Sequence, residues 1–92
     1  MNETFLKKIE ELADRGEFKQ ALSLLDNAIA ENSGDDMLFM TRGKLYWRLG
    51  DRSRATSDYS MAIHINPESP ACHLLEMARA VENFYNPDLL NP

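Results

Sequence analysis

The chain has 92 residues, of which 43 % are hydrophobic and 27 % charged, and this balance is typical of one folded domain, not of a disordered or membrane-spanning chain. Fifteen acidic and ten basic side chains give a formal net charge of −5, which argues against nucleic-acid binding because that depends on neutralising phosphates. The single cysteine excludes an intrachain disulfide. With no secretion signal and no apolar stretch long enough to span a bilayer, we expect a cytoplasmic protein that does not bind membranes.

Two helices are predicted in the first third of the chain. The apolar pattern places them at roughly residues 3–15 and 18–32, with Asn2 available to cap the first. Gly16 lies between them and can adopt the left-handed conformation that ends a helix. We therefore expect a helical hairpin here.

Two further helices follow at roughly residues 36–49 and 52–65. Asp35 or Asp36 is suited to cap the first of them, because a carboxylate accepts hydrogen bonds from free amides at a helix start. Gly50 separates the two helices as Gly16 does in the first hairpin. A second hairpin of the same kind is expected.

A fifth helix is predicted at roughly residues 70–84. Pro67 ends the preceding helix, and Ser69 followed by Pro70 is typical of a cap with proline in the first turn. Residues 85–92 form an apolar tail that two prolines prevent from continuing the helix. These elements together predict an all-α fold.

The two hairpins are related by an internal repeat. A shift of 34 residues aligns the chain with itself, and this is the length of a helix-turn-helix repeat. The alanines it superimposes lie seven residues apart on the second helix of each hairpin, where small side chains let another helix approach closely. The identities are Phe5 with Phe39, Gly16 with Gly50, Ala21 with Ala55, Ser23 with Ser57, Ala28 with Ala62, Ile29 with Ile63 and Asn32 with Asn66.

The second repeat resembles the tetratricopeptide repeat (TPR) at the positions of its aromatic residues, glycine, alanines and closing proline. These positions hold Tyr46, Leu49, Gly50, Asp51, Ala55, Tyr59, Ala62, Ile63 and Pro67. The first repeat matches more weakly, through Gly16, Phe18, Ala21, Leu25 and Ala28. It departs at Ile9, where the second repeat has the small residue Gly43, so the spacing of its helices is an open question.

The resemblance implies a domain organisation and a class of function. The chain would be a single TPR-like domain, an α-solenoid of antiparallel helix-turn-helix repeats over residues 1–92, with repeats at 2–35 and 36–69, a capping helix at 70–84 and the tail at 85–92. Proteins of this family are non-enzymatic scaffolds that bind a peptide or a partner helix in a concave groove lined by the first helix of each repeat. The alternative is a homodimeric structural domain whose groove or tail is buried against another copy.

Helical phase indicates which residues would line that groove. The candidates for partner binding are Leu6, Glu10, Met37, Met40, Lys44, Trp47, Arg48 and Leu74. Methionine packs adaptably and tryptophan often dominates binding energy, so an apolar partner segment would suit this surface. The competing interpretation is that this apolar stripe belongs to the core, as stripes at helical spacing often do.

Charges follow the repeat as well. The 34-residue shift places Glu10 beside Lys44 and Asp14 beside Arg48 on neighbouring helices, which predicts ion pairs between the repeats. Several TPR proteins hold carboxylate-ended tails with a clamp of lysine, asparagine and arginine. The corresponding positions here hold Leu6, Glu10, Thr41, Ala71 and Leu75, so that clamp is not expected.

Catalysis and metal binding find little support in the sequence. The histidines His64 and His73 lie on different predicted helices, and Cys72 next to His73 would point about 100° away from it. Asp35 and Asp36 are interpreted as helix-starting residues and not as a calcium loop. We therefore expect no enzymatic activity, no cofactor and no metal.

Overall fold

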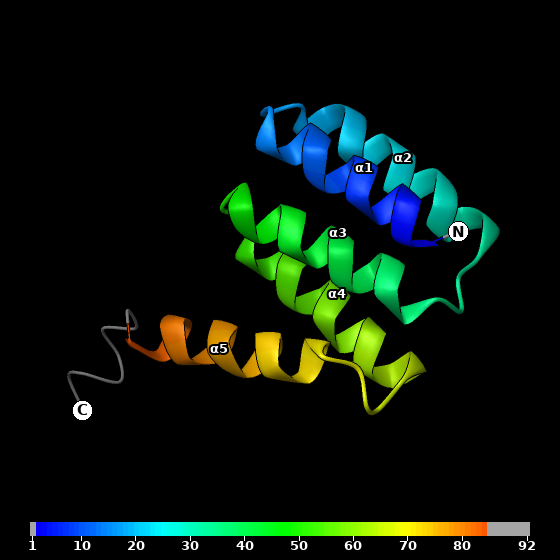
Figure 1. The fold of residues 1–92 in the computed structure, drawn as a ribbon. Coiled ribbons are helices and arrows are strands. Elements are labelled where there is room, and N and C mark those ends of the chain that lie inside the picture. The colour runs from blue at the N-terminus through cyan, green and yellow to red at the C-terminus, as the bar shows by residue number, and fades with distance from the viewer. Residues whose placement is uncertain (1, 85–92) are drawn as a thin grey trace.

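The computed structural model describes residues 2–84 and has an all-α fold, as predicted (Figure 1). Each helix begins and ends within one residue of its predicted bounds. The predicted tail, residues 85–92, lies outside the described residues. The helices are α1 (Asn2–Asp14), α2 (Phe18–Glu31), α3 (Asp36–Arg48), α4 (Arg52–Ile65) and α5 (Ala71–Phe84). None of those in the described part is long and apolar enough to cross a bilayer.

The α1–α2 and α3–α4 turns have the same backbone structure. Gly16 and Gly50 have φ angles of 81° and 82°, in the left-handed region that favours glycine. In each turn the glycine amide donates to the carbonyl three residues earlier, and the next amide donates to the carbonyl five residues earlier. The prediction that these glycines end the first helix of each hairpin is confirmed.

Side-chain caps fix the start of α3 and of α5. The Asp35 carboxylate accepts a hydrogen bond of 3.0 Å from the Met37 amide, which decides between the two predicted caps. The Ser69 hydroxyl accepts one of 3.1 Å from the Ala71 amide, as expected for a serine before the first turn of α5.

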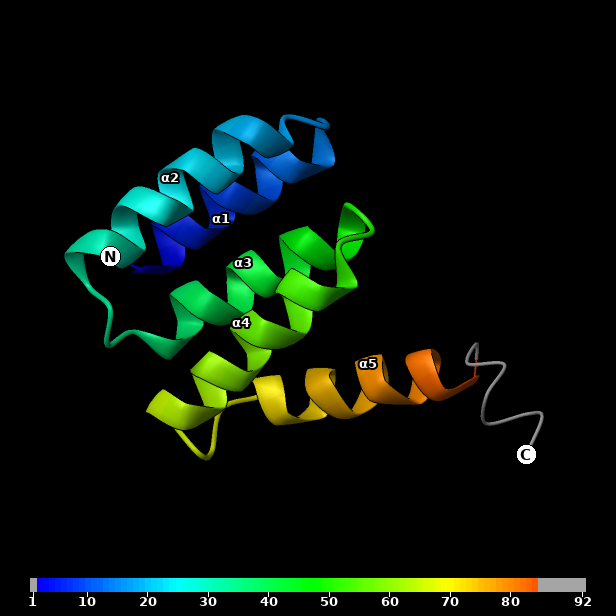
Figure 2. The same cartoon turned by 180° about the vertical axis from the view of Figure 1, so that it is seen from behind.

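The core lies between the helices of both hairpins, with α3 at its centre. Helix α3 contacts α1, α2 and α4, whereas α5 packs mainly on α4. Figures 1 and 2 show α5 leaving the end of α4 and then diverging from α3 toward its C-terminal end. The fully or almost fully buried side chains include Ile9, Leu12, Ala21, Leu25, Leu38, Phe39, Met40, Leu45, Ala55, Tyr59, Ala62, Ala71, Leu75 and Ala78.

The two hairpins differ in how closely their helices approach. At Gly43 an added Cβ would lie 2.7 Å from a ring carbon of Tyr59 and 3.1 Å from the carbonyl oxygen of Ala55, so α3 and α4 are in tight contact. The equivalent position in α1 is Ile9, whose side chain is fully buried, and α1 and α2 contact each other less extensively than α3 and α4 do. The departure from the repeat pattern at Ile9 therefore coincides with a looser hairpin.

An arginine of α3 joins three helices. Arg42 donates to Asp58 of α4 through Nε at 2.9 Å and Nη2 at 2.8 Å, and through Nη1 to Asp26 of α2 at 2.9 Å. The Asp58 side chain is only 8 % exposed, so its charge depends on this bidentate partner. The hydrogen bond to Asp58 raises the pKa of Arg42 above its usual value. This cluster fixes the second hairpin to the first.

Candidate functional site

Two neighbouring hollows lie on the face formed by α1, α3 and α5, and they share Lys44 and Arg48. The α1–α3 hollow has a volume of about 240 Å³ and the α3–α5 hollow about 390 Å³. The α1–α3 hollow is lined by Ile9, Glu10, Ala13, Asp14, Thr41, Lys44, Leu45 and Arg48. The α3–α5 hollow is lined by Lys44, Trp47, Arg48, Tyr59, Leu74, Met77, Ala78 and Val81.

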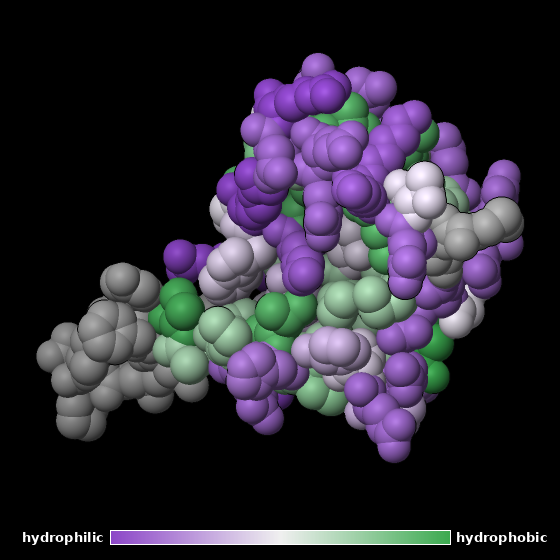
Figure 3. All heavy atoms as spheres, in the orientation of Figure 1, coloured by the Kyte–Doolittle hydropathy of each residue, from purple (hydrophilic) through white to green (hydrophobic). Residues whose placement is uncertain are grey.

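The α3–α5 hollow is mainly apolar. Tyr59 and Ala78 are buried at its floor, Trp47 is half-buried, and Met77 on α5 is 55 % exposed. On this face of the molecule the hydrophobic residues gather along α5, whereas α1 and α2 present mostly hydrophilic ones (Figure 3). Burial, followed by the charge of Asp58, raises the pKa of Tyr59 above its ordinary value.

Cationic side chains surround this apolar surface. Arg48 forms an ion pair of 3.2 Å with Asp14, and its guanidinium carbon lies 5.5 Å from the ring centre of Phe18. The guanidinium of Arg52 lies 5.4 Å from the ring centre of Trp47. Lys44 is exposed and forms no ion pair with any of residues 3–81, whose side chains the structure describes.

Of the two predicted ion pairs between the hairpins, one is present in the structure. Asp14 and Arg48 are joined as expected, at an exposed position where such a pair stabilises by at most about 1 kcal/mol. Glu10 and Lys44 line the same α1–α3 hollow, but no ion pair joins them in the described part of the chain. The α1–α3 hollow therefore carries both charge signs, whereas the described lining of the α3–α5 hollow includes cations and no acidic residue.

Five of the eight candidate binding residues line these hollows. Glu10 faces the α1–α3 hollow, Trp47 and Leu74 face the α3–α5 hollow, and Lys44 and Arg48 face both. The structure thus brings together side chains from three helices at the predicted surface.

The other three candidates lie elsewhere. Leu6 and Met37 are half-buried and pack against the core. Met40 is only 6 % exposed, which corrects the expectation that it faces an open groove. The reason is that α3 packs against helices on several sides, so more than one stripe of it is buried and helical phase alone cannot identify the open side.

Among the side chains that sequence reasoning missed at this surface, Met77 and Arg52 are exposed. Met77 lies one turn after Leu74 and one turn before Val81, so the spacing along the fifth helix could have identified it. Arg52 had no such signal, because its position over Trp47 depends on how α4 turns back along α3.

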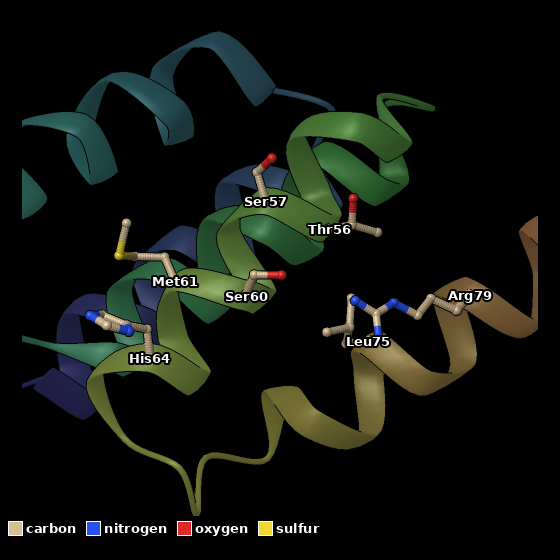
Figure 4. A pocket seen from close by; sticks show the side chains of 7 residues that line it. All are labelled: Thr56, Ser57, Ser60, Met61, His64, Leu75 and Arg79. Carbon is tan, nitrogen blue, oxygen red and sulfur yellow. The ribbon is translucent and has the colours of Figure 1, made fainter.

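A third hollow, of about 580 Å³, lies between α4 and α5 (Figure 4). The Ser60 hydroxyl and the Arg79 side chain point into it from opposite helices, while His64 and Met61 point away from α5. Arg79 is exposed, whereas Leu45, which precedes it by 34 residues, is buried. At this position α5 is therefore polar, whereas α3 is apolar 34 residues earlier.

In the described part of the chain, fold and surface define an all-α protein of helical hairpins with an apolar hollow beside α5. No protein-family model matches the chain, and no curated protein shows significant similarity to it. Among solved structures it resembles the solution NMR structure of the Bacteroides fragilis protein BF1650, with a TM-score of 0.82 and 37 % sequence identity over 94 % of this chain and 88 % of that one. The chain belongs to the same family as BF1650.

Proposed function

We propose that this chain is a non-enzymatic interaction module of the tetratricopeptide type, which binds a peptide or a helix of a protein partner in the α3–α5 hollow. Two features support the TPR assignment. The hairpins have the same glycine turn 34 residues apart, and the second hairpin carries the TPR consensus side chains at their expected positions.

The α3–α5 hollow itself is the observation that carries the binding proposal. Its volume of about 390 Å³ falls within the range of roughly 300 to 1,000 Å³ that is typical of ligand sites. Trp47 supplies a large, rigid contact surface, and Met77 is a flexible apolar side chain that adapts to its partner. The 55 % exposure of Met77 leaves apolar surface that a partner segment would remove from water.

The second candidate is a homodimer that buries the same surface. It is favoured by the exposure of Met77 together with the small size of the protein, because two repeats and one further helix bury little apolar surface. Light scattering distinguishes the two: a monomer that binds a different protein supports the first candidate, and a dimer that Met77→Glu dissociates supports the second.

Affinity enrichment from a cell extract with matched variants tests the proposal. We expect partner proteins to be retained by the wild type and lost with Met77→Glu and Trp47→Ala. Met61→Glu is the control, because Met61 is 44 % exposed on α4, does not line the α3–α5 hollow and receives the same change. Circular dichroism verifies that each variant is folded. Retention of the same proteins by the wild type and Met77→Glu would contradict binding in this hollow.

A further inference from the structure

We propose that the partner segment is acidic: it places apolar side chains in the α3–α5 hollow and a carboxylate beside them at Lys44. This inference rests on the proposed function and adds the chemistry of the ligand. It goes beyond an apolar groove, because it states which charge must accompany the apolar side chains.

The position of Lys44 is the first step. It lies on α3 one turn before Trp47 and Arg48 and forms the boundary between the two hollows. A segment that contacts Trp47 and Leu74 therefore covers the Lys44 side chain as well. The composition of the ligand has to suit that ammonium group.

The second step is that this charge is unpaired. Among residues 3–81, whose side chains the structure describes, Lys44 has no ion-pair partner and no acidic residue lines the α3–α5 hollow, although the chain has fifteen acidic residues against ten basic ones. Removing an ammonium group from water without a counter-charge is costly. A carboxylate on the ligand avoids that cost, whereas a neutral ligand does not and a basic ligand adds repulsion.

The neighbouring groups strengthen the same preference and give it a direction. Arg48 lines the hollow, and Arg52 lies over the ring of Trp47, so the apolar surface has further cations beside it. On the other side of Lys44, Glu10 and Asp14 line the α1–α3 hollow. The carboxylate of the ligand therefore belongs on the α5 side of Lys44, and any basic residue of the ligand belongs over α1.

Synthetic peptides of defined charge test the inference on the full chain. The probes are three short helical peptides without tryptophan, each with leucines at i and i+4, flanked by glutamate, by glutamine or by lysine. Trp47 is the only tryptophan of the chain, so its fluorescence emission reports occupation of this hollow. We expect the glutamate peptide to bind about tenfold more tightly than the glutamine peptide and the lysine peptide to bind most weakly.

Charge reversal gives the sharper result. Lys44→Glu is expected to invert the order, so that the lysine peptide binds most tightly. Lys19→Glu is the matched control, because Lys19 is exposed on α2, away from both hollows, and the variant has the same net charge. It should keep the order of the wild type.

Several outcomes would overturn the inference of an acidic ligand, and each of them can be distinguished from a failure of the proposed function. If all three peptides bind equally and Met77→Glu abolishes their binding, the hollow is a docking site without charge preference. If the glutamate peptide does not bind at millimolar concentration, the ligand chemistry is wrong, and the enrichment experiment alone decides the proposed function. If the full chain carrying Leu89→Ser and Leu90→Ser binds the peptide more tightly than the wild type, the occupant of the hollow is this chain's own tail. If the protein forms a dimer that excludes the peptide, the occupant is a second copy of the chain.

Discussion

The two helical hairpins of this protein share a turn and a period but not their packing. Gly16 and Gly50 end α1 and α3 in the same left-handed conformation. Within the first helix of each hairpin, however, a buried isoleucine, Ile9, occupies the position that a glycine, Gly43, has in the second hairpin. The comparison shows that the turn is determined locally, whereas the distance between two helices depends on the volume of the side chains between them.

The hairpins also differ in how they are held to the rest of the molecule. Arg42 of α3 pairs with Asp26 and Asp58, while its equivalent in α1, Lys8, is exposed. The second hairpin therefore contributes Arg42 and Asp58 to the charged cluster at the junction, and it also provides Lys44 and Trp47 for the hollow beside α5. Three substitutions test this difference between the hairpins.

Ile9→Ala has the largest expected effect. The side chain is 1 % exposed between α1 and its neighbours, so its truncation leaves a cavity and should lower the free energy of unfolding by about 3 to 4 kcal/mol. Urea denaturation followed by circular dichroism measures the loss. A change below about 1 kcal/mol would mean that α1 and α2 move together to the spacing of α3 and α4, and the comparison would then fail.

Arg42→Met is expected to have the next largest effect. It leaves Asp58, whose side chain is 8 % exposed, without its bidentate partner, and should lower the free energy of unfolding by about 2 to 3 kcal/mol. Lys8→Met is the matched control in the first hairpin and should change it by at most about 0.5 kcal/mol, because Lys8 is exposed. Equal losses for the two variants would show that Arg42 does not distinguish the hairpins.

Gly43→Ala has the smallest expected effect of the three. The added methyl group would overlap the Tyr59 ring and approach the Ala55 carbonyl oxygen, while alanine improves helix propensity, so the net loss should be about 1 to 2 kcal/mol. Gly34→Ala is the control, since nothing lies within 4 Å of its added Cβ and its φ is not in the left-handed region. Thermal unfolding of the two variants checks the difference, and a stabilised Gly43→Ala would contradict close packing of α3 on α4.

Much of the fold is encoded in short stretches of sequence, which is why it could be predicted. The glycine turns, the Asp35 and Ser69 caps and the proline after α4 act through backbone conformation and hydrogen bonds to the nearest residues. They depend on no distant part of the chain. The helix bounds, the all-α class and the 34-residue relation between the turns therefore follow from the sequence alone.

The candidate surface could be predicted only in part. The helical period correctly brought Trp47, Lys44 and Leu74 to one face, and the repeat shift paired Asp14 with Arg48. The same period wrongly predicted that Met40 is exposed. Met40 is buried because α3 has neighbours on several sides. Helical periodicity in the sequence indicates which residues share a face of a helix, but it does not indicate how many of its faces are buried by neighbouring helices.

What the tertiary structure alone decided is where the apolar surface remains open. Helix α5 diverges from α3, and α4 returns along α3 (Figure 1). The first arrangement leaves the hollow lined by Trp47, Met77 and Val81, and the second places Arg52 over Trp47. Both depend on the angles between helices, which arise from side-chain volumes summed over the whole core. The sequence by itself determined the helices and their turns, and their packing determined which charges border the open apolar surface.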